Sequence, residues 1–241
     1  MVSAAFPSIH YEAYLHTWLL VNTRTFYFPL PKTKTPTNRD DCMALNPFAD
    51  YFNHTAVSTP STPCCDVQFS STGYKITTPT LIKKDQEIYI SYGNHSNDFL
   101  LAEYGFILVD NKWDEISLDN HIFPLLSASQ RETLKDTGFL GKYVLDREVI
   151  CHRTQVALRL LCQTPRKWQR FVDGIDDAEN DQVAVDKILL QVLNNYREHV
   201  AEMLGKLDEV NAGFGSQRET LFRRWKQIDL LLTSAIARIQ S

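Results

Sequence analysis

The sequence lacks several features that would point directly to a function. Its five cysteines form no C-x-x-C pair, and Cys64 and Cys65 are adjacent, so cysteine spacing predicts no metal site. With 25 basic and 29 acidic residues the net charge is −4, which argues against a nucleic-acid-binding surface. The apolar run from Trp18 to Val21 is far too short to span a bilayer. The odd cysteine count and the lack of a signal peptide favour a reducing intracellular compartment, cytoplasmic or nuclear.

Apolar residues make up 44% of the 241 residues, which is enough for a substantial core in one large domain or two small ones. The first part of the chain carries patterns of short, mixed elements. They are a helix over 8–21 capped by Ser8, a polar loop over 33–39, an exposed loop over 55–63, a hairpin of strands 66–70 and 74–78 around Gly73, a strand over 87–91, and a short helix between Ser96 and Gly105.

From about Asn111 onward the pattern becomes helical. Ser129-x-x-Glu132 and Ser216-x-x-Glu219 predict capping boxes, and Thr164-Pro165 predicts a helix start. The acidic stretch 173–181 is expected to link two helices. Two long apolar stripes at helical spacing follow. They comprise Val185, Ile188, Leu189, Val192, Leu193, Tyr196 and Val200, and then Leu221, Phe222, Trp225, Ile228, Leu232 and Ile236.

Three motifs carry a family resemblance when they are taken together. They are Asp50-Tyr-Phe-Asn53-His54, Glu87-Ile-Tyr-Ile-Ser-Tyr92-Gly93 and Glu-Tyr104-Gly105-Phe106. In this order they resemble the C-terminal half of a SET-domain lysine methyltransferase. The greatest similarity is to the branch typified by Rubisco large-subunit methyltransferase, which methylates non-histone proteins. The match runs from about residue 22 to 106, and a looser likeness to the family's helical domain covers most of the rest.

The resemblance implies an α+β fold and a division into two domains. Residues 1–110 would form the C-terminal half of a SET domain, with short β-strands and a knot-like core. Residues 111–241 would form an all-α lobe similar to the Rubisco-methyltransferase substrate-binding domain, which presents a protein substrate with a target lysine. The implied cofactor is S-adenosylmethionine, and no metal is implied.

The implied reaction is an in-line displacement at a sulfonium methyl group, and it needs a neutral amine. Free lysine has a pKa of about 10.4, and burial in a narrow apolar channel favours its neutral form. A tyrosine hydroxyl and main-chain carbonyls can orient the lone pair of the amine. Tyr92 matches the family's catalytic tyrosine. A tyrosine at the end of a strand is equally compatible, on its own, with capping a core.

Four residues match positions that bind the cofactor in the family. They are Arg24, Asn53, His54 and Tyr104. The main chain of Asn53-His54 would hold the adenine, and Arg24 would lie near the cofactor carboxylate, where a guanidinium can bind with two hydrogen bonds. Each has a simpler alternative on its own: a surface arginine, a loop asparagine, a satisfied histidine, and an aromatic residue packed at a helix end.

Two residues match the substrate-lysine channel, namely Asp50 and Cys65. Cys65 replaces an aromatic residue that often walls the channel in relatives, which leaves the number of methyl groups transferred open. Asp85 occupies a turn position where the family usually has glycine. Aspartate tolerates a positive φ better than most residues, so the turn is expected to survive.

The resemblance leaves two functions open. One is a protein-lysine N-methyltransferase acting on a non-histone protein, and the other is a non-catalytic interaction protein derived from a SET domain. No Gly-x-Gly segment precedes Asp50, although the family uses a glycine-rich loop to hold the cofactor. If Met1 is the true start, we expect the chain alone to bind S-adenosylmethionine weakly. We also expect it to associate through an exposed sheet edge.

Overall fold

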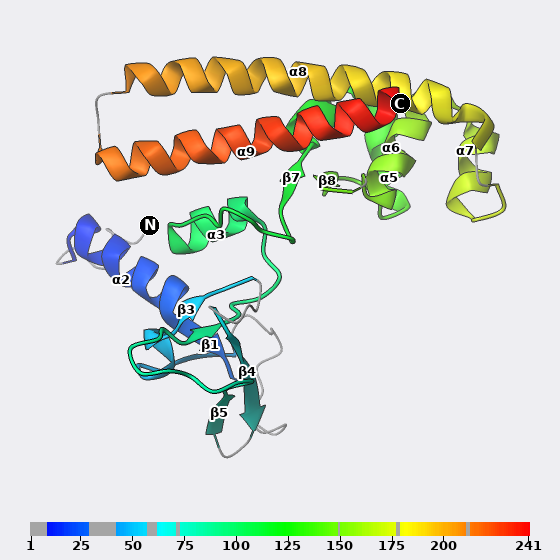
Figure 1. Cartoon of the computed structure of the whole chain (residues 1–241). Coiled ribbons are helices and arrows are strands. Elements are labelled where there is room, and N and C mark those ends of the chain that lie inside the picture. The colour runs from blue at the N-terminus through cyan, green and yellow to red at the C-terminus, as the bar shows by residue number, and fades with distance from the viewer. Residues whose placement is uncertain are drawn as a thin grey trace. The chain divides into compact units, whose positions relative to one another are not determined.

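The computed structural model describes residues 9–28, 42–56, 62–70, 73–148, 150–176, 179–210 and 213–241. The chain forms two compact units (Figure 1). The first unit contains Met1–His95 and Phe99–Lys112, and the second contains Ser96–Asp98 and Trp113–Ser241. Each unit is described separately below.

The first unit is built from short elements. In chain order these are α2 (Tyr11–Arg24), β1 (Thr25–Tyr27), β2 (Met43–Leu45), η2 (Ala49–Tyr51), β3 (Asn53–His54), β4 (Cys64–Ser70), β5 (Gly73–Thr77), β6 (Tyr89–Ile90) and α3 (Asn97–Tyr104), of which the first turn counts with the second unit. Strands β1 and β2 form an antiparallel pair, and a second sheet has the order β3-β6-β4-β5. Strand β6 therefore lies between β3 and β4, and it runs parallel to both.

The β4–β5 hairpin was predicted from two short β-prone runs on either side of Gly73, and its existence is confirmed. Val67 pairs with Ile76, and Phe69 pairs with Tyr74 at a ring-centroid distance of 4.7 Å. Aromatic and β-branched cross-strand pairs of this kind stabilise an antiparallel ladder. Gly73 has a φ of +153°, which favours glycine at the start of the second strand.

Helix α2 begins later than the sequence predicted. It starts at Tyr11 after His10, which makes no side-chain capping bond, while Ser8 and the loop over 33–39 lie outside the described residues. The helix buries none of its residues, and Trp18 is 50% exposed. No helix in the described ranges has the length and apolar character needed to cross a membrane.

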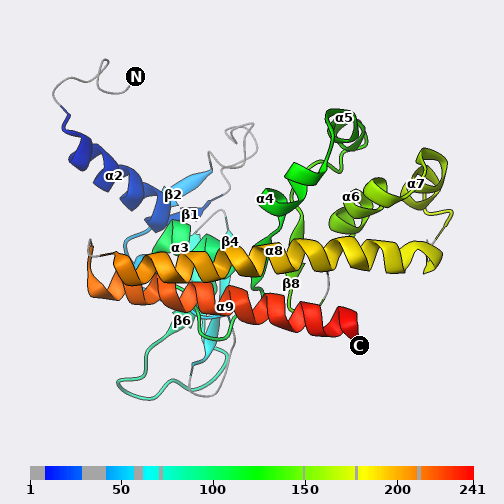
Figure 2. The same ribbon diagram turned by 90° about the horizontal axis from the view of Figure 1, so that it is seen from above.

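The second unit is mainly helical. Its elements are β7 (Glu115–Ser117), α4 (Asp119–Ile122), η3 (Phe123–Leu125), α5 (Ala128–Asp136), β8 (Val144–Asp146), α6 (His152–Cys162), α7 (Pro165–Val172), η4 (Glu179–Asp181), α8 (Gln182–Glu209) and α9 (Gly215–Gln240). Helices α8 and α9 lie side by side along their length (Figures 1 and 2). The core includes the fully buried side chains of Leu189, Leu193 and Leu232, which belong to the predicted apolar stripes. Burial of such stripes is the main source of helix stability in a folded protein.

Both predicted capping boxes are wrong. Helix α5 begins at Ala128, and the reciprocal bonds connect Ser127 with Gln130 instead of Ser129 with Glu132. Helix α9 begins at Gly215, so Ser216 lies inside its first turn and cannot cap it. At α5 the sequence offers Ser127 two positions before Ser129, and the observed helix start selects Ser127. At α9 the residue before the helix is Phe214, whose backbone N–H donates to Oε1 of Gln217.

The predicted α+β fold with a helical second lobe is confirmed. The second unit also contains the two-stranded antiparallel sheet of β7 and β8, which the sequence analysis did not predict. At the start of α9, Leu221 and Phe222 are exposed, so the apolar stripe is buried only from Trp225 onward.

Candidate active site

Tyr92 is held at both ends by one short segment of the first unit. Its backbone N–H donates to Nδ1 of His54 at 3.0 Å, and its hydroxyl donates to the backbone carbonyl of Phe52 at 2.9 Å. The hydroxyl oxygen keeps its lone pairs available as acceptors. The two motifs that the sequence analysis singled out are therefore joined by direct hydrogen bonds.

The parallel pairing of β3 with β6 brings these motifs together. Asn53 lies opposite Tyr89, and His54 lies opposite Ile90. Ile90 is almost completely buried, which fixes the register because a slip of one residue would turn it to the other face. Tyr92 lies two residues after the end of β6, where its backbone N–H reaches the side chain of His54 in β3.

Aromatic rings from two segments, β3 and the end of α3 with the residues that follow it, lie around Tyr92. The ring centroid of His54 lies 5.1 Å from that of Tyr92, and the ring centroid of Tyr104 lies 5.0 Å from it. The ring centroid of Phe106 lies 6.2 Å from that of Tyr104, so Phe106 packs against the same aromatic group. Helix α3 ends at Tyr104, and Gly105, with a φ of +79°, turns the chain so that Phe106 faces the same group.

The side chain of Asn53 points away from this aromatic group. Its amide donates to Oε1 of Glu87 at 2.6 Å, and the hydroxyl of Tyr89 donates to Oε2 of the same carboxylate at 2.7 Å. These two hydrogen bonds lower the pKa of Glu87, and the bond from Tyr89 has the larger effect. Glu87 thus ties β3 to the segment before β6. The sequence analysis quoted Glu87 only as part of a motif and gave it no role.

Arg24 and Asp50 were expected in different parts of the site, but they form an ion pair. Nη1 of Arg24 lies 3.0 Å from Oδ1 of Asp50, and both side chains are partly exposed. Arg24 is the last residue of α2, and Asp50 lies in the turn η2. The remaining N–H groups of the guanidinium could still bind an anionic group.

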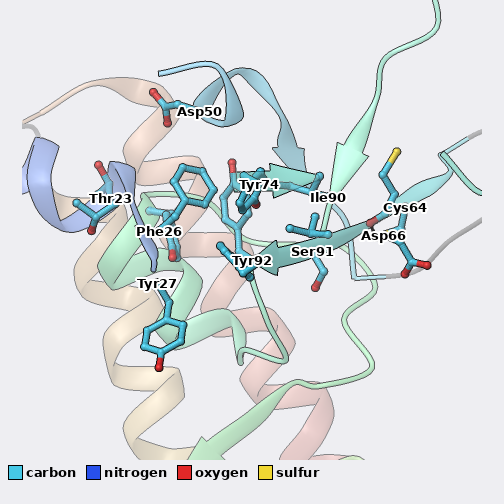
Figure 3. Close-up of a pocket in the computed structure, with 15 residues that line it drawn as sticks. Thr23, Phe26, Tyr27, Asp50, Cys64, Asp66, Tyr74, Ile90, Ser91 and Tyr92 are labelled. Atoms are coloured by element: carbon cyan, nitrogen blue, oxygen red, sulfur yellow. Dashed lines mark hydrogen bonds between the residues drawn. The ribbon is translucent and has the colours of Figure 1, made fainter. Parts of the chain in front are cut away.

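A cavity of about 680 Å³ opens beside Tyr92 (Figure 3). Asp50, Cys65, Tyr92 and Tyr104 all line it, so four of the predicted site residues share one space. Phe26 and Tyr74 add aromatic walls, with ring centroids 5.6 Å apart. The volume falls within the usual range of small-ligand sites, about 300–1,000 Å³.

The surroundings of Tyr92 keep its hydroxyl protonated. Burial raises its pKa above the ordinary value for tyrosine, the charge of Arg24 opposes this increase, and Asp50 and Tyr104 add to it. At neutral pH the phenol is therefore an uncharged hydrogen-bonding group and not a base.

Two unusual backbone positions frame the strand that leads to Tyr92. Asp85 has a φ of +65° in the turn before β6, so the expected turn survives with aspartate in the glycine position. Gly93 has a φ of +131°, and a Cβ there would lie 2.5 Å from Nε2 of His95. Glycine is thus required immediately after Tyr92.

Comparisons with known proteins identify relatives of both units. A family model described as "Ribosomal lysine N-methyltransferase 2 C-terminal domain" matches residues 114–237, slightly more than half of the chain. Ribosomal lysine N-methyltransferase 2 of Saccharomyces cerevisiae is 26% identical over 216 residues, covering 83% of this chain and 44% of the relative. Ribosomal lysine N-methyltransferase set11 of Schizosaccharomyces pombe is 28% identical over 222 residues, covering 86% and 55%.

SET domain-containing protein 4 of Mus musculus is 27% identical over 227 residues, covering 88% of this chain and 50% of the relative. The chain thus spans about half the length of the curated relatives it matches. Two solved structures share its fold at 15% identity. The Rubisco LSMT structure bound to sinefungin and monomethyllysine has a TM-score of 0.53 and covers 99% of this chain and 56% of its own. The structure of the LSMT SET domain bound to MeLysine and AdoHcy has a TM-score of 0.51, and the match covers 99% of this chain and 59% of that chain.

Proposed function

The chain belongs to the family of the ribosomal lysine N-methyltransferase 2 C-terminal domain, and on this premise we propose that it works in protein-lysine methylation. Relatives that match most of the chain are named as ribosomal lysine N-methyltransferases or SET-domain proteins. In the proposed division, residues 1–110 form the C-terminal half of a SET domain and residues 111–241 bind the substrate protein. The two compact units support this division.

One observation carries the proposal: the hydroxyl of Tyr92 is fixed at the wall of a cavity while its oxygen remains able to accept a hydrogen bond. A tyrosine that only capped a core would not need its backbone and hydroxyl bonded to the same neighbouring segment. This arrangement favours a catalytic site over a non-catalytic interaction module, since preorganised groups lose little freedom when they orient a substrate.

The cavity suits S-adenosylmethionine in size and in chemistry. Aromatic faces and carboxyl oxygens near Tyr92 favour cationic groups, and a sulfonium and an incoming ammonium are both cations. Tyr104, which lines the cavity, is proposed to hold this cofactor together with Arg24 and the main chain of Asn53-His54, which are not among the lining residues. When bound, it supplies an electrophilic methyl group on sulfur.

Asp50 and Cys65 are proposed to line the channel for the substrate lysine. Cys65 is buried in β4 and contributes a small thiol, so this wall leaves more room than an aromatic residue would. Burial of the incoming amine favours its neutral form, and the hydroxyl oxygen of Tyr92 accepts a hydrogen bond from one of its N–H groups, which orients the nitrogen lone pair. S-adenosylmethionine held beside Tyr92 would supply its methyl group to that lone pair, with S-adenosylhomocysteine as the leaving group and one amine proton released to solvent.

The proposed substrate is a lysine of a non-histone protein, and ribosomal proteins are the first candidates because two relatives carry that name. To test this, the purified protein, with all the sequence that its gene encodes, is incubated with S-adenosylmethionine carrying a trideuterated methyl group and with ribosomal proteins of its own cells. Peptide mass spectrometry should find labelled lysine.

Two tyrosine variants make the assay specific. Tyr92→Phe should lose the label, whereas Tyr11→Phe, which removes the hydroxyl of a tyrosine that is 73% exposed on α2, should keep it. If only other non-histone proteins are labelled, the proposed ribosomal substrate is wrong, but the proposed methyl transfer to lysine stands. Absence of labelled lysine with the wild-type protein would favour the non-catalytic interaction module.

A further inference from the structure

Two histidine rings hold the main chain of Tyr92, one on each side of its Cα. Nδ1 of His54 lies 3.0 Å from the backbone nitrogen of Tyr92, and Nε2 of His95 lies 3.1 Å from its carbonyl oxygen. Sequence resemblance gave His54 a role in cofactor binding and gave His95 none. Each ring makes a hydrogen bond to the main chain of the residue proposed to be catalytic.

Simple hydrogen-bond chemistry fixes the protonation of the two facing nitrogens. A backbone N–H can only donate, so Nδ1 of His54 must carry a lone pair and no proton. A carbonyl can only accept, so Nε2 of His95 must carry a proton. The observed arrangement therefore requires a neutral His54 ring. Protonation of Nδ1 would place two N–H groups face to face and break the bond to Tyr92.

The position of His95 is built into the surrounding structure. Its ring stacks on that of Phe99, with a distance of 4.1 Å between the ring centroids and an angle of 15° between the ring planes. Its backbone carbonyl accepts a hydrogen bond from Nδ2 of the buried Asn111 at 2.8 Å. Gly93 leaves the space that the ring occupies, since a Cβ there would lie 2.5 Å from Nε2. Gly93 N–H is in turn held by Oγ of Ser91.

Protonation of His54 is opposed by its environment. Burial lowers its pKa, the nearby His95 lowers it further, and a hydrogen bond with the backbone of Ile90 acts in the opposite direction. The groups that face the ring are His95, Tyr92 and Phe106. Protonation of His54 in acid therefore places a positive charge in a buried position where a second imidazole already opposes it.

We propose that His54 and His95 are paired positioning residues, which clamp the main chain of Tyr92 and release it in acid when His54 becomes protonated. The clamp sets the direction in which Tyr92 leaves β6 and hence the placement of its hydroxyl against Phe52. The structural clamp is independent of the reaction, but its importance for methyl transfer depends on the proposed function.

The clamp is tested first without cofactor or substrate. The chain is labelled with ¹⁵N-tyrosine, and the amide signal of Tyr92 is assigned as the one that Tyr92→Phe removes. Its chemical shift is followed from about pH 8 to about pH 5, where histidine titrates. The Tyr92 amide should shift upfield in one step whose midpoint lies below 6.5, the ordinary pKa of histidine.

Variants identify the ring responsible. His54→Asn places an oxygen acceptor near Nδ1 that does not titrate in this range, so the amide should stay at its high-pH position throughout. His54→Phe should give the low-pH position at every pH. His95→Gln keeps an N–H donor near Nε2 without a charge, so the midpoint should rise toward the ordinary histidine value. A wild-type amide shift that does not change with pH would overturn the clamp, as would His54→Asn titrating like the wild type.

The link to catalysis is tested separately on the full-length protein. Because His54 also belongs to the proposed cofactor site, kcat of the wild type and of His54→Asn is measured as a function of pH at saturating S-adenosylmethionine, and each profile is normalised to its own value at about pH 8. Protonation of the substrate amine lowers both profiles in acid, but kcat should fall less steeply between about pH 7 and about pH 5 in His54→Asn than in the wild type. Identical normalised profiles would disconnect the clamp from the reaction even if the amide titration is as expected. If the full-length protein shows no methyl-transfer activity, the proposed function is wrong. The amide titration would still decide whether the clamp exists, because it needs neither cofactor nor substrate.

Discussion

At the scale of single residues, the direction of individual side chains determines which groups meet at the candidate site. Sequence motifs predicted that His54, Tyr92 and Tyr104 belong together, and their rings do lie in contact. The same motifs could not predict that the amide of Asn53 binds Glu87, or that Arg24 pairs with Asp50. Those contacts depend on side-chain rotamers and on residues distant in sequence, which a motif does not encode. The cofactor and substrate roles of these residues remain predictions.

Asp85 gives a prediction about local backbone energy. Its φ of +65° strains any residue with a side chain, and aspartate tolerates the strain better than alanine. Asp85→Ala should lower the free energy of unfolding by about 1 kcal/mol relative to Asp85→Gly, since glycine adopts this conformation without a steric cost. Urea denaturation of the two variants measures the difference. Equal stability of the two would contradict the strain at this position.

At the scale of elements, a buried ion cluster in the second unit holds α9 in place. Arg224 on α9 lies 2.6 Å from Oδ1 of Asp98 and 2.7 Å from Oδ2 of Asp114. Arg224 and Asp114 are almost completely buried, so neither charge can be solvated by water if its partner is lost. The sequence showed an apolar stripe over the residues of α9, and Arg223 and Arg224 stand next to each other within it. Burial of only one of these two arginines is a tertiary effect.

Arg224→Met should destabilise the protein by about 3–5 kcal/mol, because it leaves Asp114 buried without its counter-ion. Arg223 provides a matched control one position earlier, where its ion pair with Glu219 is exposed. Arg223→Met should cost no more than about 0.5 kcal/mol. Chemical denaturation of both variants is the measurement. Similar losses for the two arginines would show that the Arg224 cluster is not a stabilising contact.

At the scale of the whole molecule, the boundaries of helices were harder to predict than their existence. The long helices α8 and α9 follow from their apolar stripes, which are buried for most of their length. The sheet of β7 and β8 escaped prediction because each strand has only three residues, too few to show an alternating pattern. The assignment of residues 1–110 and 111–241 to two functional domains stays a prediction.

Stability of the whole chain should fall in acid. His54 in the first unit and His121 in the second have pKa values lowered first by burial, and then by His95 and His199 respectively. A lowered pKa in the folded state means that unfolded chains bind more protons. The stabilisation is therefore complete above the ordinary value of 6.5 and is lost as the pH falls through the folded-state pKa.

His121→Phe tests the second of these contributions. The ring of His121 stacks on Tyr196 at 4.2 Å, and phenylalanine keeps a ring in that place without a titrating nitrogen. The free energy of unfolding, measured by urea titration at a series of pH values, should fall less steeply in acid for this variant than for the wild type. Parallel curves for the two proteins would exclude His121 as a source of acid sensitivity.

The most direct test of the central claim is the single-turnover rate of methyl transfer to lysine, measured at saturating S-adenosylmethionine for the full-length wild type and Tyr92→Phe. The hydroxyl of Tyr92 is proposed to orient the amine and not to hold the cofactor. The variant should therefore lose about 10²–10³-fold in rate, the size of effect seen when one preorganised hydrogen-bonding group is removed from an active site, while cofactor affinity measured by calorimetry stays the same. A Tyr92→Phe protein that transfers methyl groups at the wild-type rate would contradict the account.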